Sequence, residues 1–359
     1  MITRIINYVK LSYLFLYVRK QRLKIRERKR WKRAFLYFLN SISKESSDYL
    51  GRWNVLEGFA KSDIIRIQKA KKWKEKDNLI LICVMLNEKE RIEVFLNHYR
   101  KIGVRRFVIL DNGSTDGTVE YLKKQPDVEL FQTKDKFESK RKMGWINRLI
   151  SYYGNNYWYL VVDADELLVW KGVEETCIQD ATKYFDKESI TRVRALMVDM
   201  YPMEMKWNSD ESFNQIYPKC IFFDYNTYYH QDHKELYLIC GGPRKRMLGV
   251  EVWLTKYPLF RLKEKEILCN PHTIYPYKNK KSPCYLAVLH YKFVTHEDQR
   301  KMQEYARKGN YACNSAEYKL YTRKYKVNAN NFNFFFDCSA EYQSSKSLEM
   351  IKEIRRIPL

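Results

Sequence analysis

The chain has 359 residues, of which 45% are hydrophobic, so it can bury a sizeable core as one large domain with appendages or as two domains. Its formal net charge of +23 does not indicate a nucleic-acid binder, because residues 1–76 carry +15 of that charge and the remaining chain only +8. None of the eight cysteines stands at C-x-x-C spacing, which excludes a zinc ribbon and a thioredoxin-like motif and favours reduced thiols in a cytosolic protein.

Residues 1–76 are predicted to form a basic helical arm. Residues 19–33 hold ten basic side chains and one acid, with apolar patches on both sides. This pattern is typical of a segment that lies on an anionic membrane surface, which would place the protein on the inner face of the cytoplasmic membrane. The alternative is that the apolar stripe packs on the main domain. The apolar run 11–18 is too short to span a bilayer. A run of positive charge follows it, where a cleaved signal peptide would have a small-residue site.

From residue 77 the pattern alternates between buried strands and amphipathic helices. We expect strands at 79–86, 105–111, 128–133 and within 158–170, and helices at 90–103, 114–125 and 138–154. Such alternation predicts βαβ units and a mostly parallel central sheet flanked by helices. The fold class is therefore α/β over residues 77–296.

The second half of the chain is less regular. Strand character is present within 190–202, 245–262 and 285–294. Helical patterns return from residue 297, so residues 297–359 are predicted to be a helical C-terminal extension.

An acidic turn provides the most informative motif. Asp163, Asp165 and Glu166 follow the apolar strand YLVV, at the strand end where open α/β sheets bind ligands. Carboxylate oxygens suit Mg²⁺ or Mn²⁺, and such ions commonly hold substrate phosphates. Other polar residues follow the neighbouring strands, namely Asn87, Glu88 and Asp111. All of them can converge on one crevice.

These segments resemble the family 2 glycosyltransferases of bacteria. The resemblance lies in LNE (86–88), LDNGSTDGT (110–118) and VVDADELLV (161–169). It implies the GT-A fold of nucleotide-diphospho-sugar transferases, an inverting mechanism and a nucleotide-sugar donor. It further implies that Asp111 contacts the nucleoside, that Asp163 lies near the ribose and metal, that Asp165 is the main metal ligand, and that Asn87 and Glu88 border the base pocket. Many members of the family carry an E-D pair that supplies the catalytic base, and no clear pair stands in the expected region here.

His290 and Lys292 are candidates from the C-terminal half. They alternate within a strand-like run and so share one face. The imidazole can ligate Mn²⁺, and the ammonium can hold a diphosphate. His272 is a second option for the imidazole. A structural role in the core is the alternative for each histidine.

Three further residues are candidates for the donor and the acceptor. Arg244 and Arg246 follow a Gly-Gly turn and would share a face if the chain is extended, where guanidinium groups suit a diphosphate. Solvated surface positions are the alternative for both. Asp199 ends an apolar strand and is the candidate general base.

The sequence thus predicts a metal-dependent glycosyltransferase acting on a glycan or lipid-linked saccharide, such as lipopolysaccharide or capsule. Two rivals remain. A nucleotidyl- or phosphosugar-transferase would use the same acidic turn. A non-enzymatic polybasic protein that binds membranes or nucleic acid would need only the arm.

Overall fold

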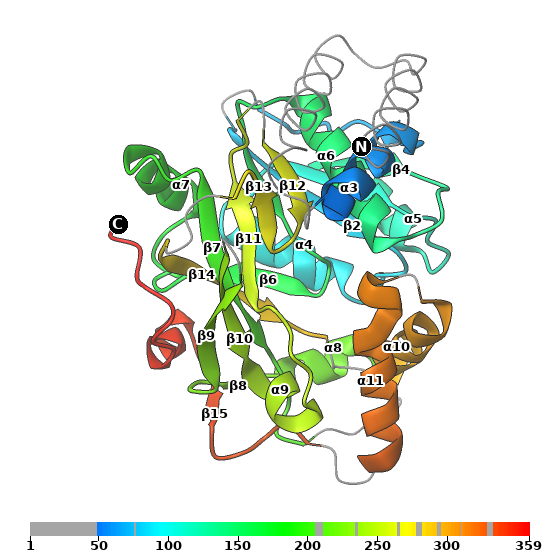
Figure 1. The fold of residues 1–359 in the computed structure, drawn as a ribbon. Coiled ribbons are helices and arrows are strands. Elements are labelled where there is room, and N and C mark those ends of the chain that lie inside the picture. Colours follow the sequence, from blue (N-terminus) through cyan, green and yellow to red (C-terminus); the bar gives the residue numbers. More distant parts are fainter. Residues whose placement is uncertain are drawn as a thin grey trace, which may run out of the picture.

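The computed structural model describes residues 49–74, 77–204, 211–233, 236–263, 266–277, 282–292, 296–309, 311–328 and 333–359. Its centre is a large twisted sheet with helices around it (Figure 1). The basic run 19–33 and its apolar flanks lie outside the described residues. No helix within the described ranges is long and apolar enough to cross a bilayer.

Nine strands form the central sheet in the order β1-β4-β3-β2-β5-β11-β7-β14-β6. Their bounds are β1 (Ile65–Gln68), β2 (Leu79–Met85), β3 (Phe107–Asp111), β4 (Val128–Gln132), β5 (Trp158–Val161), β6 (Glu166–Val169), β7 (Arg192–Asp199), β11 (Thr255–Phe260) and β14 (Cys284–His290). Strands β2, β3, β4, β5, β7 and β14 run in one direction, and β1, β6 and β11 run in the other. The predicted α/β fold with a mostly parallel sheet is confirmed.

Alternating residues of the sheet face two separate layers of core. In β2, Leu79, Leu81 and Cys83 join one buried cluster, while Ile80 and Ile82 join another. Helices α4 (Ile92–Lys101), α5 (Thr118–Lys123) and α7 (Ile178–Lys187) contribute to the first, and α3 (Tyr49–Lys61) and α6 (Ser139–Tyr153) to the second. Burial on both faces explains why β2 reads as an unbroken apolar run.

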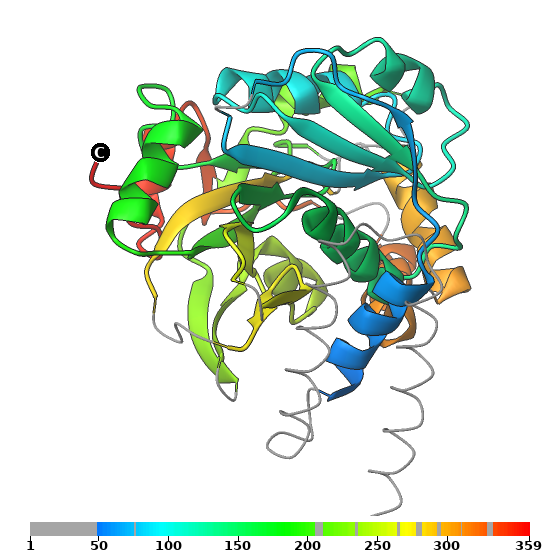
Figure 2. The same ribbon diagram turned by 90° about the horizontal axis from the view of Figure 1, so that it is seen from above.

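The described part of the predicted arm packs on the main domain. Helix α3 lies along α6 (Figure 2), and a Cβ added at Gly144 would lie 2.2 Å from the backbone carbon of Gly58. Strand β1 pairs with β4 at the sheet edge. The sheet therefore begins at residue 65, within the range 1–76 that the sequence assigns to the arm.

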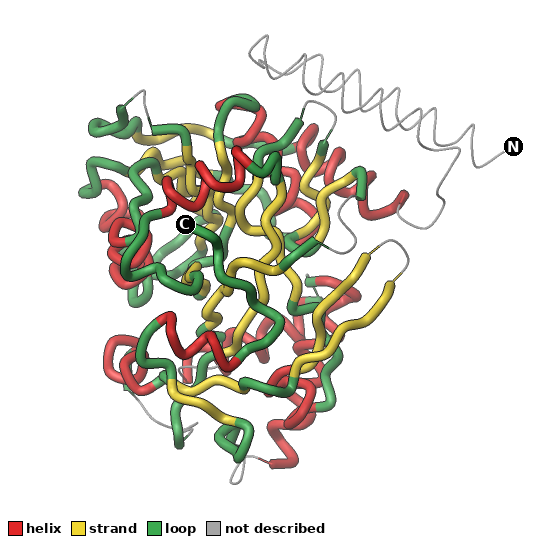
Figure 3. The backbone as a smooth tube through the Cα atoms, turned by 90° about the vertical axis from the view of Figure 1, so that its left-hand side faces the viewer, coloured by secondary structure: helices red, strands yellow, loops and turns green. Residues whose placement is uncertain are grey.

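The second half contains three small two-stranded sheets. They pair β8 (Phe222–Asp224) with β15 (Ser339–Glu341), β9 (Tyr228–His233) with β10 (Leu236–Gly241), and β12 (Ile267–Asn270) with β13 (Thr273–Tyr275). The β9–β10 hairpin projects from the body (Figure 3). The remaining short helices are α8 (Phe213–Ile216) and the 3₁₀ segments η1 (Tyr217–Lys219) and η2 (Ser345–Met350).

The segment 245–262, for which the sequence predicts strand character, begins as a helix and continues as a strand. Residues 245–248 are helical, because α9 (Gly242–Leu248) begins with Pro243 in its first turn and ends at Gly249, whose φ is 65°. Strand β11 follows within the predicted 245–262 range. The helices expected after residue 297 are α10 (His296–Lys308) and α11 (Ala312–Asn328). The described residues 333–359 of the predicted helical extension contain instead strand β15, which pairs with β8, and the 3₁₀ segment η2.

Candidate active site

A cavity of about 590 Å³ opens at the carboxyl ends of the parallel strands. Its floor comes from the segments that follow β2, β3, β4 and β5, and α10 and α11 form the opposite wall. The floor residues include Asn87, Glu88, Asn112, Lys134, Asp135, Lys136, Phe137, Asp163 and Asp165, and the wall includes Asp298, Lys301, Tyr305, Tyr311 and Tyr318.

The acidic turn connects β5 to β6 and is held by two lysines, of which Lys256 is buried and Lys142 is half-buried. Lys142 of α6 bonds to the Asp163 carboxylate, and Lys256 of β11 bonds to that of Glu166. The Glu166 carboxylate also accepts a hydrogen bond from the Asp163 backbone N–H at 3.2 Å. These contacts fix the turn and leave Asp165 directed at the cavity.

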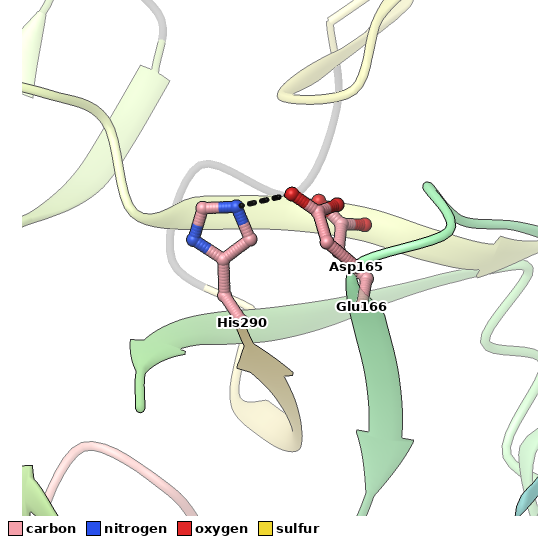
Figure 4. Close-up of side chains that lie close together, drawn as sticks. All are labelled: Asp165, Glu166 and His290. Atoms are coloured by element: carbon pink, nitrogen blue, oxygen red, sulfur yellow. Dashed lines mark ion pairs between the residues drawn. The ribbon is translucent and has the colours of Figure 1, made fainter. Parts of the chain in front are cut away.

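Asp165, Glu166 and His290 form a candidate metal centre (Figure 4). One possible ligand atom from each lies within 4.8 Å of the other two. His290 Nε2 is 3.4 Å from Asp165 Oδ2, and strand pairing places His290 opposite Glu166 between β14 and β6. Two carboxylates and an imidazole are ligands that Mn²⁺ accepts, and carboxylate oxygens also suit Mg²⁺.

His290 is oriented from behind by Asp199. Its Nδ1 lies 2.7 Å from Asp199 Oδ1, and the second carboxylate oxygen accepts from Arg244 Nε at 2.7 Å. A carboxylate on one ring nitrogen of a histidine fixes the tautomer that presents the other nitrogen to a metal. Asp199 is 2% exposed and is not among the cavity-lining residues, so the structure places it behind His290 and not beside an acceptor.

Neighbouring charges shift the pKa values of His290 and Asp165 in opposite directions. Burial alone would lower the pKa of His290, but Asp165 and Asp199 outweigh burial and raise it. Burial opposes ionisation of Asp165, yet His290, Arg91 and Lys256 hold its pKa well below the usual range. Asp165 is therefore an anion in this environment.

Of the predicted metal ligands, Asp165 and His290 are brought together, while the Asp163 carboxylate is bonded to Lys142. Glu166 is the cluster member that sequence reasoning missed. Two signals point to it: it directly follows the acidic pair, and it begins the strand that pairs with the one carrying His290.

Asn87 and Glu88, which the sequence assigns to a nucleotide pocket, both line the cavity. The Asn87 side-chain oxygen accepts from the Thr115 backbone N–H at 2.8 Å, which ties the loops after β2 and β3 together. Burial raises the pKa of Glu88 to about 7, against the opposing charges of Arg91 and Lys301. Their nitrogens are 3.5 and 3.9 Å from the Glu88 oxygens.

The wall from α10 and α11 supplies residues that the sequence did not identify. Asp298 forms a buried double contact with Arg91, and Lys301 Nζ is 3.0 Å from the Asn87 carbonyl oxygen. Both contacts dock α10 on the loop after β2. Charged residues are common on a polar helix, so the sequence alone does not distinguish Asp298 and Lys301 from their solvent-exposed neighbours.

Aromatic rings continue this wall. Tyr311 packs against Phe137, Tyr305 and Tyr318, with ring centroids 5.1, 4.5 and 4.8 Å apart. The Lys292 ammonium lies 4.7 Å from the Tyr318 ring centre and 3.0 Å from the Glu317 carboxylate. Lys292 therefore reaches the cavity as expected, although it lies beyond the end of β14.

The two arginines do not share a face. Residues two apart in a helix point in different directions, and both lie in α9. Arg244 is buried against Asp199, whereas Arg246 forms a two-pronged contact with buried Asp224 at 2.8 and 3.1 Å. Neither arginine lines the cavity, so the expectation of an extended pair of phosphate ligands is wrong.

Asp111 and His272 also have local partners. The fully buried Asp111 carboxylate accepts from the backbone N–H groups of Gly113 and Ser114 and from Gln132 Nε2, at 3.0 to 3.2 Å. His272 Nδ1 lies 2.6 Å from the Thr255 carbonyl oxygen, and burial lowers its pKa to about 4. Neither side chain lines the cavity.

No protein-family model matches this sequence, and no curated protein matches it. Among solved structures, residues 1–349 of TarS from S. aureus are similar at 14% identity and a TM-score of 0.31, over 71% of this chain and 73% of that one. The mannosyltransferase PcManGT from Pyrobaculum calidifontis, in complex with GDP-Man and Mn²⁺, is similar at 17% identity and a TM-score of 0.27, over 47% of each chain. HddC from Yersinia pseudotuberculosis is similar at 12% identity and a TM-score of 0.29, over 62% of this chain and 97% of that one. Similarities at this level carry no functional argument.

Proposed function

We propose that this protein is a glycosyltransferase of the GT-A type that uses a nucleotide-sugar donor and Mn²⁺ or Mg²⁺. The observation that carries the proposal is the Asp165–His290 pair, in which Asp165 lines the cavity and His290 is held behind it by Asp199. The cavity volume lies within the range of small-molecule sites, about 300–1,000 Å³. The motifs that resemble family 2 glycosyltransferases surround the same cavity.

Asp165 and His290 are the residues that would hold the cation, with Glu166 beside them. A bound divalent cation would stabilise the negative charge that develops on the departing diphosphate. Lys142, Lys292 and Lys301 also line the cavity and can contribute positive charge toward the same diphosphate. Asn87, Glu88 and Asn112 offer polar groups to the nucleoside. Asp111 supports that region through its turn.

The proposed reaction is a single displacement. An acceptor hydroxyl forms a new bond to the anomeric carbon of the donor sugar while the bond from that carbon to the diphosphate oxygen breaks. The hydroxyl proton passes to a carboxylate of the protein, and the nucleoside diphosphate leaves with the bonding electron pair. Attack from the opposite face inverts the anomeric centre.

Asp298 replaces Asp199 as the proposed general base. It lines the cavity, while Asp199 is enclosed by His290 and Arg244. Glu297 and Asp298 also form an acidic pair, which the resemblance associates with the catalytic base, at a position in α10 later than expected. A carboxylate has about four lone-pair positions, so Asp298 can accept a hydrogen bond from an acceptor hydroxyl while it contacts Arg91.

The proposed acceptor is a glycan or lipid-linked saccharide of the cell surface. Phe137, Tyr305, Tyr311 and Tyr318 offer apolar ring faces and hydroxyl groups at the cavity, which is the chemistry that a sugar ring requires. The basic segment 19–33 would bring the enzyme to an anionic membrane carrying such an acceptor, on the cytoplasmic side.

Donor binding and product analysis test the proposal. We expect UDP-, GDP- or dTDP-sugars to raise the melting temperature only with Mn²⁺ or Mg²⁺, and slow hydrolysis to release the nucleoside diphosphate. Release of the nucleoside monophosphate or a sugar phosphate would instead indicate a nucleotidyl- or phosphosugar-transferase. Asp298→Asn should lower turnover at least about a hundredfold with donor affinity retained. Absence of any cation-dependent stabilisation would refute the proposed function.

A further inference from the structure

The charges around the acidic turn are already balanced by the protein itself. Four carboxylates in and behind the turn and across the cavity each contact an ammonium or guanidinium group. These pairs are Lys142 with Asp163, Lys256 with Glu166, Arg244 with Asp199 and Arg91 with Asp298. Of the described lysines and arginines, none forms an ion pair with Asp165, whose partner is His290 at 3.4 Å.

Lys256 is unusual because it places a buried positive charge inside the candidate cation centre. The residue is 6% exposed, and its Nζ bonds to Glu166, which is 2% exposed. Its charge also acts on Asp163 and Asp165. Burying an ammonium is costly unless it is paired, so the Lys256–Glu166 pair is a fixed part of the site.

Lys142 acts in the same way at the other end of the turn. It comes from α6, lines the cavity and bonds to Asp163, whose side chain remains 35% exposed. Each lysine thus satisfies the carboxylate that a divalent cation would otherwise share with Asp165. The affinity of oxygen-ligand sites for such cations depends on the number of charged ligands.

We propose that Lys256 and Lys142 keep the acidic turn charge-balanced, so that the protein alone binds a divalent cation weakly and the diphosphate of the nucleotide completes the site. This inference rests on the proposed function. Asp165 would supply one negative charge and His290 its Nε2 nitrogen. The diphosphate oxygens would supply the remaining negative charge. Glu166 acts as a brace of the turn, because its second oxygen holds the Asp163 backbone N–H.

Binding of the cation together with the diphosphate would help the protein to use its donor. A cation held only in the presence of the diphosphate is delivered where leaving-group charge develops. The same dependence lets the cation dissociate after the nucleoside diphosphate leaves, so product release does not require a tight metal site to open. Binding of each partner must strengthen binding of the other by the same factor.

The experiment is a Mn²⁺ titration by calorimetry and by electron paramagnetic resonance, without nucleotide and with UDP or GDP. The native protein should bind Mn²⁺ at least about tenfold more tightly with the diphosphate present. Lys256→Met and Lys142→Met should each tighten Mn²⁺ binding without nucleotide by about tenfold, because a positive charge near the cation is removed. Both should reduce the strengthening caused by the diphosphate. Lys256→Arg, which keeps the charge, should behave like the native protein.

Lys171→Met is the matched control. Lys171 is also buried, at 7% exposure, and pairs with Glu349 at 3.1 Å, but it does not line the cavity. It should leave Mn²⁺ binding unchanged. Because Lys256→Met could unfold the protein by leaving Glu166 alone, the double variant Lys256→Met with Glu166→Gln removes both charges. If Glu166 is a brace, this variant binds Mn²⁺ within about threefold of the native protein.

Two results would overturn the inference while leaving the proposed function intact. One is tight Mn²⁺ binding by the native protein without nucleotide. The other is Mn²⁺ affinity in both lysine variants that matches the Lys171→Met control. If the native protein binds no Mn²⁺ with UDP, GDP or dTDP, the proposed function is refuted, and the inference with it.

Discussion

His290 and Asp199 are paired neighbours at the ends of the parallel strands β14 and β7, and their side chains meet with His290 Nδ1 2.7 Å from Asp199 Oδ1. The contact lies on the side of the imidazole away from Asp165. Asp199 therefore acts on the cavity only through His290.

Asp199→Asn should accordingly weaken Mn²⁺ binding by about 10- to 100-fold, because the imidazole loses the partner that fixes its tautomer. We expect the turnover number at saturating Mn²⁺ and donor to fall much less. Calorimetry with Mn²⁺ and UDP or GDP, followed by donor hydrolysis assays, separates the two effects. A large fall in turnover with unchanged Mn²⁺ affinity would restore Asp199 as the general base.

Asp165→Asn should remove the one negative ligand that the protein keeps available. We expect cation-dependent donor binding to be lost and turnover to fall at least about a hundredfold. The melting temperature without ligands should change little, because the Asp165 side chain is 29% exposed. Glu120→Gln, an exposed carboxylate in α5 outside the cavity, is the control. Full activity of Asp165→Asn, or in excess EDTA, would contradict the metal-dependent mechanism.

Arg246→Met should destabilise the fold without affecting the donor. The change leaves fully buried Asp224 without its guanidinium partner, at a cost of about 3 kcal/mol in the free energy of unfolding. Urea denaturation measures this loss, and nucleotide titration should give native affinity. The control for charge alone is Arg323→Met, at an exposed position of α11. Weakened nucleotide binding in a folded Arg246→Met protein would return Arg246 to the phosphate site.

His98 should make the fold sensitive to mild acid. Burial lowers its pKa to about 4 despite the Leu168 carbonyl oxygen, 2.8 Å from Nε2, whereas an unfolded histidine titrates near 6.5. The folded pKa is the lower one, so the unfolded state binds the proton more readily. Stability is therefore complete above about pH 6.5 and falls toward pH 4.

Between pH 7 and pH 5 this loss should amount to about 1–2 kcal/mol. Urea unfolding of the native protein and of His98→Gln at both values provides the comparison. His98→Gln keeps a neutral donor near Leu168 and should lose less stability across the same interval. An equal loss in both proteins would assign the acid sensitivity to other groups.

Deleting residues 1–45 should abolish binding to anionic vesicles and spare hydrolysis of a soluble donor, because the cavity is built from residues outside that range. Each basic residue near such a surface contributes about 1 kcal/mol, weakened by salt. Co-sedimentation with anionic and neutral vesicles at two salt concentrations measures the effect. Equal binding of both proteins would refute a membrane role, and failure of the shortened chain to fold would favour packing of the arm on the domain.

The sequence predicts the elements between residues 79 and 169 well because burial on both faces produces unbroken apolar strands. Asp165 and His290 are identifiable for a related reason: each stands at the end of such a strand. Arg244 and Arg246 are misassigned because the sequence pattern predicts an extended segment where α9 begins, with Pro243 in its first turn.

The remaining site residues depend on tertiary contacts that no local pattern encodes. Asp199 stands at the end of a strand, just as the acidic turn follows one. Only the contacts with Arg244 and His290 show that Asp199 is enclosed. Asp298 and Lys301 belong to a polar helix whose sequence does not reveal which face meets the cavity. Lys256 is a charged residue within a buried strand, and its role becomes clear only from its contact with Glu166.

The position of β14 in the sheet has a consequence for the order in which the protein can become active. Strand β6, which follows the acidic turn directly, pairs with β14 and with no other strand of the described sheet. During synthesis the acidic turn therefore leaves the ribosome long before its neighbouring strand can be placed between β6 and β7. His290 arrives on that same late strand. Cation binding at Asp165 would thus report that the sheet is complete, and a chain arrested before β14 would carry every residue of the acidic turn without the means to use a donor.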